Sequence, residues 1–272
     1  TRATGLLTGT NLNAPVNGVR PNPSAANVIE TVSLGESRAQ AVGVNATLNF
    51  SGTGQSVSIG LPGTIGKSEP RFRWKRGLTL MAYYNVGKSR NNTDGAFNVP
   101  PTGSLDAEWG PSNGDVRHRV TLVAYSTALK NFSASIYVSA SSGAPYTIRT
   151  GRDDNGDLIL NDRPLGVGRN TARAGWQYNS NGYFTYTIGV GKRTVALPPG
   201  ITLTSSGGGL SLSTFSQADA PRYRLMLNVS VQNPTNHANY VSYNGNMTSP
   251  FFLKPTAVDG VRRVDVSIGF SF

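Results

Sequence analysis

Oxygen-bearing side chains crowd one short segment of this 272-residue chain. They are Asp153, Asp154, Asn155, Asp157, Asn161 and Asp162. Carboxylate and amide oxygens are the ligands that Ca²⁺ prefers, and four of these residues form a candidate calcium site: Asp153, Asn155, Asp157 and Asp162. The spacing is not that of an EF-hand, because Leu158 stands at the sixth position, which requires glycine. Asp and Asn also stabilise turns through their own side chains, so a solvated turn is the alternative.

Asp115 and His118 have the residue types of two members of a catalytic triad. The same stretch also fits the outer end of a strand, with Arg117 and Arg119 on its polar face. The other histidine, His237, lies in an Asn-rich turn. The chain contains no nucleophile elbow, zinc-ligand spacing or phosphate-binding loop. We therefore expect no enzyme, no catalytic residue and no cofactor other than the candidate Ca²⁺.

The composition favours a membrane barrel. Charged residues make up 14% of the chain, hydrophobic residues make up 38%, and cysteine is absent. Soluble domains carry about 25% charged residues, whereas a barrel with a polar, uncharged lumen needs few. The net charge is +11, but the 25 Lys and Arg residues are scattered along the chain. They fit strand ends near anionic lipid head groups, and we expect no nucleic-acid partner.

The final stretch alternates with period two, so its apolar side chains share one face of a strand. They are Val264, Val266, Ile268, Phe270 and Phe272. This pattern resembles the last strand of a bacterial outer-membrane barrel, in which one face meets lipid and the other a polar lumen. The resemblance implies that these five residues form the signal read by the barrel-assembly machinery. A strand of a soluble sandwich alternates in the same way.

Similar alternation predicts strands at 28–50, 71–87, 116–128, 132–140, 183–194 and 222–231, with a short strand tail at 1–10 and a short hairpin possible within 196–221. Long loops at 11–26, 88–115, 151–176 and 233–262 then fall at one end, and the connections at 51–70, 129–131 and 195–221 at the other. The predicted fold class is all-β, an antiparallel transmembrane β-barrel, present as a partial barrel of about seven or eight long strands. Aromatic residues are candidates for interfacial girdles: Trp74, Trp109, Trp176, Tyr83, Tyr84, Phe132, Tyr186, Phe270 and Phe272.

Several strings, taken in order, resemble one family. They are NLNAP at 11–15, SRNNTDG at 89–95, EWGP at 108–111, DVRHR at 115–119, SGAPY at 142–146, GRDDNGD at 151–157, NDRP at 161–164, GVGRN at 166–170 and SPFF at 249–252. With the closing Phe-Ser-Phe they look like the C-terminal barrel of Oar-like TonB-dependent outer-membrane receptors. No single string is specific, but the ordered set spans nearly the whole chain.

The resemblance implies that residues 1–272 are the C-terminal part of a barrel of about 22 strands, without the plug and the first part of the barrel. The parent protein would be a receptor that takes up or exports an unidentified solute. Its implied partners are outer-membrane lipid and lipopolysaccharide, the barrel-assembly machinery, and TonB through the missing plug. Two alternatives stay open: a small non-energised outer-membrane barrel that binds or conducts a solute, and a secreted β-sandwich adhesin.

Overall fold

The computed structural model describes residues 1–51, 54–60, 77–192, 201–206, 209–214 and 221–272. Strands dominate these residues, and the one helical element among them is the 3-10 turn η1 (Asp106–Glu108). Within the same ranges, no helix has the length and apolar character needed to cross a membrane. The prediction of an all-β, antiparallel chain is therefore confirmed.

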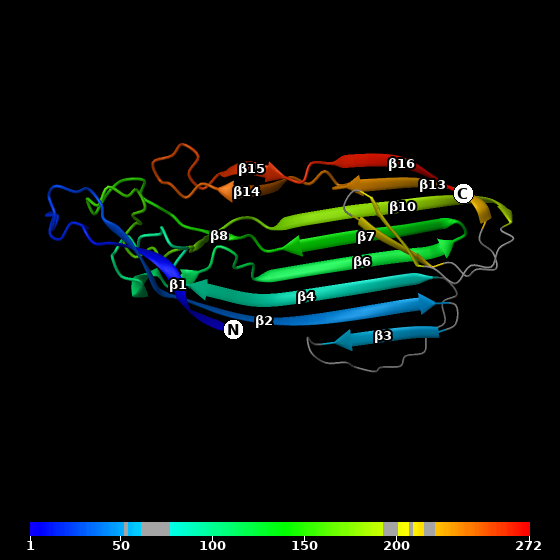
Figure 1. The fold of residues 1–272 in the computed structure, drawn as a ribbon, viewed down its shortest axis with the longest axis horizontal. Coiled ribbons are helices and arrows are strands. Elements are labelled where there is room, and N and C mark those ends of the chain that lie inside the picture. The colour runs from blue at the N-terminus through cyan, green and yellow to red at the C-terminus, as the bar shows by residue number, and fades with distance from the viewer. Residues whose placement is uncertain (52–53, 61–76, 193–200, 207–208, 215–220) are drawn as a thin grey trace.

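One large antiparallel sheet contains most of the strands, and its strand order follows the chain (Figure 1). Its path runs through β1 (Arg2–Asn11), β2 (Ile29–Ser51), β4 (Leu78–Asn91), β6 (His118–Leu129), β7 (Phe132–Ser141), β10 (Gln177–Lys192), β13 (Pro221–Gln232) and β16 (Arg263–Ser271). Two strands lie off this path: β3 (Gly54–Gly60) pairs with β2, and β5 (Gly110–Pro111) pairs with β4. Among the described strands, no pairing joins β16 to β1 or β3, so the sheet is open.

Three two-stranded sheets stand apart from the large one. They are β8 (Pro145–Tyr146) with β9 (Ala172–Arg173), β11 (Ile201–Ser206) with β12 (Gly209–Thr214), and β14 (Asn239–Tyr243) with β15 (Pro255–Asp259). The β11–β12 pair is the hairpin that the sequence predicts within residues 196–221.

The pairing register gives the large sheet one apolar and one polar face, because directly opposed residues point the same way. One cross-strand row contains Leu48, Leu80, Ala124, Ile136, Gly182, Val231 and Val264. The neighbouring row on the other face contains Asn49, Thr79, Tyr125, Ser135, Tyr183, Ser230 and Asp265. The alternation that the sequence shows strand by strand therefore becomes two continuous surfaces.

The described residues do not bury a hydrophobic core. Val99 is the one buried hydrophobic side chain among them. The apolar residues of the final stretch are exposed to 57% (Val264), 63% (Val266), 72% (Ile268), 62% (Phe270) and 87% (Phe272). Full burial of such a side chain is worth about 1.5–3 kcal/mol. These five residues alone would therefore forgo roughly 5–10 kcal/mol in water, as much as the net stability of a typical domain.

Aromatic rings gather at the two ends of the apolar face. Near the long loops, centroids lie 6.2 Å apart from Tyr84 to His118, 6.2 Å from His118 to Trp176 and 6.3 Å from Trp176 to Tyr178. The opposite end holds a second set of ring contacts: Phe132 with Phe184, and Tyr223 with Phe270, which also contacts Phe272. Tyr178 and Tyr186 stand eight positions apart on β10, which is about 27 Å along a strand.

The predicted girdle residues divide into four groups. Most of those predicted do lie at these two ends: Tyr84, Trp176, Phe132, Tyr186, Phe270 and Phe272. Tyr83 does not, because it lies opposite Asn45 and Thr121 on the polar face. Adjacent residues of a strand point to opposite faces, so the prediction that placed both Tyr83 and Tyr84 in a girdle was wrong for Tyr83. Trp109 lies in a loop after η1, and Trp74 falls outside the described residues.

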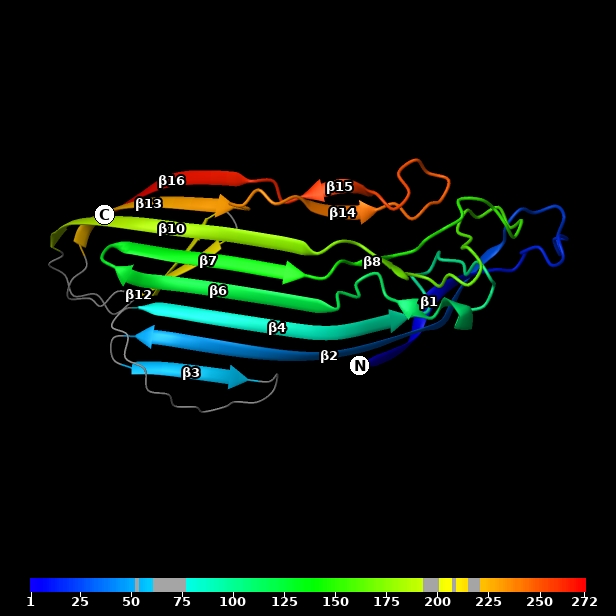
Figure 2. The same cartoon turned by 180° about the vertical axis from the view of Figure 1, so that it is seen from behind.

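The long connections lie together at one end of the sheet (Figures 1 and 2). They leave β1, β4, β7 and β13 and return to β2, β6, β10 and β16. At the other end, β6 and β7 are joined by a tight turn in which Leu129 faces Phe132 and Asn131 adopts a positive φ of 63°. The left-handed conformation suits Asn better than most residues. The predicted segregation of the four loops is therefore confirmed.

Several boundaries differ from the prediction. β4 extends to Asn91 rather than to residue 87, and β10 begins at Gln177 rather than at residue 183. Apart from Tyr178, the extra residues are polar or glycine on both faces, so they show no clear alternation. β3 lies in a segment predicted as loop, as do β14 and β15. Residues 71–76, predicted as the start of a strand, lie outside the described residues.

Candidate functional site

The loops at one end of the sheet pack against each other through polar groups. Among the described residues, the most completely buried side chains are Glu108, Asn13, Thr8 and Asp115. A cluster held this way depends on hydrogen bonds, because a buried polar group without a partner costs about 1–3 kcal/mol. We call this region the loop cluster; it comprises residues 11–28, 92–117, 142–176 and 233–262.

A buried ion pair joins two of these loops. The Arg163 guanidinium donates from Nη1 to Glu108 Oε2 at 2.8 Å and from Nη2 to Oε1 at 2.6 Å. The side chain of Glu108 is 1% exposed and that of Arg163 is 9% exposed. Two parallel N–H···O bonds fix both distance and orientation, so η1 is locked onto the segment after the Asp-rich loop.

Arg169 connects the same loops at a second point, and its side chain is 3% exposed. Its Nε donates to the Glu108 carbonyl at 3.1 Å, and its other nitrogens bond Asp94 and both oxygens of Asn91. Gly110 permits this approach, since a Cβ there would lie 2.5 Å from the Arg169 carbonyl oxygen. Arg169 therefore ties the end of β4 to η1.

Asp115 is bonded to arginines rather than to His118. Its carboxylate accepts from the Ser89 N–H at 2.6 Å, from Arg117 Nε at 2.9 Å and from Arg173. Burial alone would raise the pKa of Asp115, but the hydrogen bonds from Arg117, Ser89 and Arg173 lower it below its ordinary value. The residue therefore acts as an ionised anchor for the loop.

His118 lies in the aromatic end row of the apolar face. Its Nδ1 bonds the Tyr84 hydroxyl at 2.8 Å, and its ring lies between those of Tyr84 and Trp176. Asp115 therefore does not orient this histidine, and the two residues do not form part of a triad.

The Asp-rich segment folds as a set of side-chain-stabilised turns. The carboxylate of Asp153 accepts from the N–H groups of Asp157 and Leu158, both at 2.9 Å. Asp157 Oδ1 accepts from Ile159 at 2.7 Å, and Asp162 Oδ2 accepts from Asp154 at 2.8 Å.

The four candidate calcium ligands thus share one loop, but their oxygens bond its backbone. Asn155 follows the same rule, since its Oδ1 accepts from the Asp157 N–H at 2.9 Å. Burial raises the pKa of Asp162 above its ordinary value, as do the nearby charges of Asp157 and Asp154, despite two backbone hydrogen bonds. Within the described residues, no group of three or more His, Cys, Asp or Glu is arranged to hold a metal ion. Calcium binding here stays a prediction.

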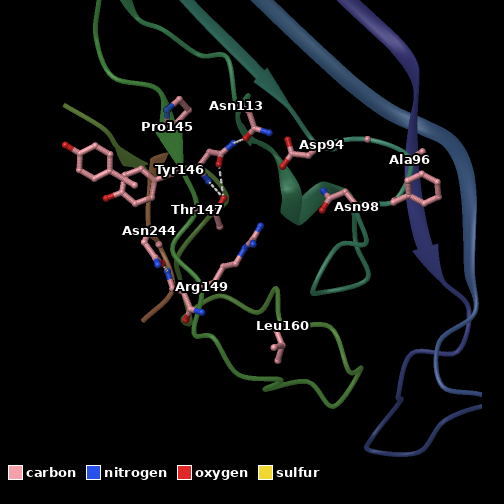
Figure 3. Close-up of a pocket in the computed structure, with 16 residues that line it drawn as sticks. Asp94, Ala96, Asn98, Asn113, Pro145, Tyr146, Thr147, Arg149, Leu160 and Asn244 are labelled. Carbon is pink, nitrogen blue, oxygen red and sulfur yellow. Dashed lines mark hydrogen bonds between the residues drawn. The ribbon is translucent and has the colours of Figure 1, made fainter. Parts of the chain in front are cut away.

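An open pocket of about 770 Å³ lies within the loop cluster (Figure 3). Its walls come from segments far apart in the sequence, around residues 94–98, 113, 145–149, 160, 170 and 243–246. Arg149 reaches into the middle of it. Among the described residues, the Arg149 guanidinium has no ion-pair partner, and the one carboxylate in the lining, Asp94, is paired with Arg169.

Several hydrogen-bond donors that line the pocket have no partner among the described residues. Asn246 Oδ1 accepts from the Thr248 N–H at 3.1 Å, and its Nδ2 has no hydrogen-bond partner among the described residues. Asn113 Oδ1 accepts from Asn170 Nδ2 at 2.8 Å, so its own Nδ2 is also available. Together with Arg149, these groups suit an acceptor-rich or anionic solute.

Docking of the β14–β15 hairpin closes one wall of the pocket. Arg149 N donates to the Gly245 carbonyl at 2.8 Å, and Met247 N donates to the Arg149 carbonyl at 2.9 Å. The rings of Tyr146 and Tyr243 stack with centroids 5.6 Å apart. Gly245 is required for this contact, because a Cβ there would lie 2.0 Å from the Thr147 carbonyl oxygen.

Sequence reasoning did not select the residues that organise this cluster. They are Glu108, Arg149, Arg163 and Arg169. Glu108, Arg163 and Arg169 stand inside the strings EWGP, NDRP and GVGRN, which carry the family resemblance. Those strings were therefore the signal in the sequence that could have pointed to these three residues. No family model matches this chain, and neither a curated protein nor a solved structure was found to match it.

Proposed function

We propose that this chain forms part of the wall of a transmembrane β-barrel in the bacterial outer membrane, within a TonB-dependent receptor of the Oar-like kind. The observation that carries the proposal is the continuous apolar face of the large sheet, exposed along β16 and bounded by aromatic rings at both ends. Hydrocarbon tails would cover this face at no cost in exposed apolar surface. In water, the exposed apolar face would be the largest unfavourable contribution to the free energy of folding.

The dimensions of the face support a membrane. The about 27 Å that separates Tyr178 and Tyr186 along β10 corresponds to roughly 21 Å across a bilayer for a strand tilted by about 40°. Outer-membrane barrels carry an apolar band about 25 Å tall, flanked by aromatic girdles. The opposite face, with rows of Asn, Thr, Ser and Tyr, would line the lumen.

The open sheet favours a large barrel over the two alternatives. A β-sandwich needs a second sheet packed on the apolar face, and the described residues bury one hydrophobic side chain. A complete barrel of about eight strands closes on itself and fills its interior with side chains, whereas β16 and β1 are not paired here. Both features fit a segment of a wider wall.

Under this proposal the loop cluster faces the outside of the cell and its pocket receives the solute. The Arg149 guanidinium and the amide nitrogens of Asn113 and Asn246, which have no partner among the described residues, support a solute rich in acceptor oxygens. Energy coupling would come from TonB through a plug, which the family resemblance alone suggests.

The orientation of the two faces can be tested with single cysteines, because the chain has none of its own. Cysteine is introduced at Ile136 and Leu227 on the apolar face and at their neighbours Ser135 and Asn228 on the polar face, and each is labelled with bimane. In outer-membrane vesicles we expect blue-shifted emission at the first pair alone. Equal emission from neighbouring positions would refute the membrane wall.

The parent protein can be tested by fractionating the source cells and probing with an antibody against residues 153–169. A heat-shifted outer-membrane band far larger than 28.8 kDa is expected of a receptor. A heat-shifted band near 28.8 kDa would replace the receptor with a small barrel. Signal in the soluble fraction would refute both.

A further inference from the structure

Three arginines stand in one cross-strand row near the loop end of the sheet. Arg2 on β1 lies opposite Arg38 on β2, and Arg38 lies opposite Arg90 on β4. In the next even-numbered row towards the apolar band, Gln40 lies opposite Lys88. All four basic side chains are exposed. We call Arg2, Arg38, Lys88 and Arg90 the basic row.

The basic row shares the apolar face of the sheet. The β2–β4 register is continuous from Ser37 to Phe50, so Arg38 points the same way as Val42 and Val44. Lys88 and Arg90 stand two and four positions beyond the exposed Val86 on β4. For a tilted strand, this is about 5 and 10 Å past the apolar edge. Head groups add roughly 5–8 Å to each side of a bilayer core, so Lys88 lies at their level and Arg90 lies just beyond them.

The row is electrostatically unfavourable without a partner. Like charges directly opposite each other destabilise a sheet. The carboxylate that bonds these arginines is that of Glu36, which accepts from Arg2 Nη2 at 3.1 Å and lies 3.5 Å from Arg38 Nη2. In the part of the chain that the structure describes, four basic side chains thus share one bonded carboxylate, and the excess of positive charge calls for an external anion.

Trp109 holds two of the guanidinium groups in place. The Cζ of Arg38 lies 5.1 Å from the centroid of the Trp109 ring, and Arg90 Nη2 donates to the Trp109 carbonyl at 3.2 Å. Arg2, Arg38 and Arg90 each use Nη2 in their hydrogen bonds and ion pairs with other described residues. Their Nε and Nη1 groups remain for a ligand. Guanidinium groups bind phosphate through paired N–H bonds, so the chemistry of the row suits phosphate.

We propose that the basic row binds the phosphate groups of a phosphorylated glycolipid, lipopolysaccharide, in the outer leaflet. The assignment rests on the proposed function, because the row meets a lipid head group only if the apolar face meets lipid. Several adjacent guanidinium groups suit a lipid with more than one phosphate. Their reach of about 10 Å past the apolar edge suits a head group that extends further than that of a phospholipid.

The test titrates the full chain, in a mild non-ionic detergent, with fluorescent diphosphoryl lipid A. The variant Arg38→Gln/Arg90→Gln removes two charges from the row, and Arg152→Gln/Lys254→Gln removes two exposed charges from the loops. A basic residue beside an anionic lipid surface contributes about fivefold in affinity, so we expect about 25-fold weaker binding for the first variant. The second should bind within about twofold of the parent. Equal losses in both would overturn the proposal.

Two further measurements identify the ligand and guard against misfolding. Competition by inorganic phosphate or phosphatidylglycerol at the concentration at which lipid A itself competes would overturn the glycolipid assignment. The variant Gln40→Arg adds a charge beside Lys88 and should bind lipid A about fivefold more tightly. Absence of that gain would also refute the site, even if the Arg38→Gln/Arg90→Gln variant failed to fold.

The outcome is separable from that of the proposed function. Alternating bimane emission together with lipid A binding that is unaffected by the row variants would refute the row and leave the barrel wall. Row-dependent binding without alternating emission would refute the barrel wall and the placement of the row in the outer leaflet, and would leave only a phosphate-binding row.

Discussion

Replacing Glu108 with glutamine should open the loop cluster while leaving the large sheet intact. The Arg163 side chain is 9% exposed and would keep its charge without a counterion. One face of the glutamine amide would also present N–H groups to the N–H groups of Arg163. Breaking a buried pair by removing one partner costs about 3–5 kcal/mol.

The loss can be read from amide hydrogen exchange on the chain in detergent. The reporters are the Thr150 N–H, which bonds the Asp162 carbonyl at 2.8 Å, and the Val167 N–H, which bonds the Pro164 carbonyl at 3.0 Å. At 1.4 kcal/mol per tenfold change, we expect their exchange to accelerate roughly 100- to 3,000-fold. Amides of β7 and β10 should keep their rates.

The exposed pair of Arg263 and Asp265 provides a matched control. Its side chains are 66% and 42% exposed, and such pairs contribute about 0–1 kcal/mol. Asp265→Asn should therefore leave the loop reporters unchanged. The double variant Glu108→Gln/Arg163→Gln should lose less than the sum of the two single losses. An acceleration below about fivefold in Glu108→Gln would refute the view that this buried pair holds the loops together.

Three other perturbations give distinct readouts. Ile136→Lys should lower the free energy of unfolding in lipid vesicles by about 2–4 kcal/mol, because it puts a charge at mid-height on the apolar face. Ser135→Lys, on the polar face, should not lower it. Equal losses of unfolding free energy for the two variants in a urea titration would contradict the assignment of the faces. The lowered pKa of Asp115 means that its stabilising contribution is complete above pH 3.8 and is lost as the pH falls through the still lower folded value. Exchange at the Ser89 amide should accelerate in that window in the parent but not in Asp115→Asn, and a flat parent profile would speak against the anchor. Chelating Ca²⁺ should leave the Asp157 and Leu158 amides protected, since Asp153 already accepts from both; protection that appears only with added Ca²⁺ would instead support the calcium site.

The strand faces could be predicted from residue order because a strand alternates with an invariant period of two. Wherever one face is apolar and the other polar, that alternation is visible, as in 132–140 and 264–272. It disappears where nearly every side chain on both faces is polar, which is why the first residues of β10 and the last residues of β4 were missed. β14 and β15 were missed for another reason: each has five residues and carries apolar side chains on both faces, so no alternation is visible. β3 was missed because the segment 51–70 around it is rich in Gly, Ser and Pro, a composition typical of loops.

Sequence alone also determined that the chain is all-β, that its long loops fall at one end, and that its last residues form an alternating strand. Tertiary structure decided which residues of those loops meet. Glu108 and Arg163 come from different loops, and the three arginines of the basic row come from three different strands. Alternation is a property of one strand and can be read locally. Ion pairs and cross-strand rows depend on the register between strands and on the docking of loops, which no single segment encodes.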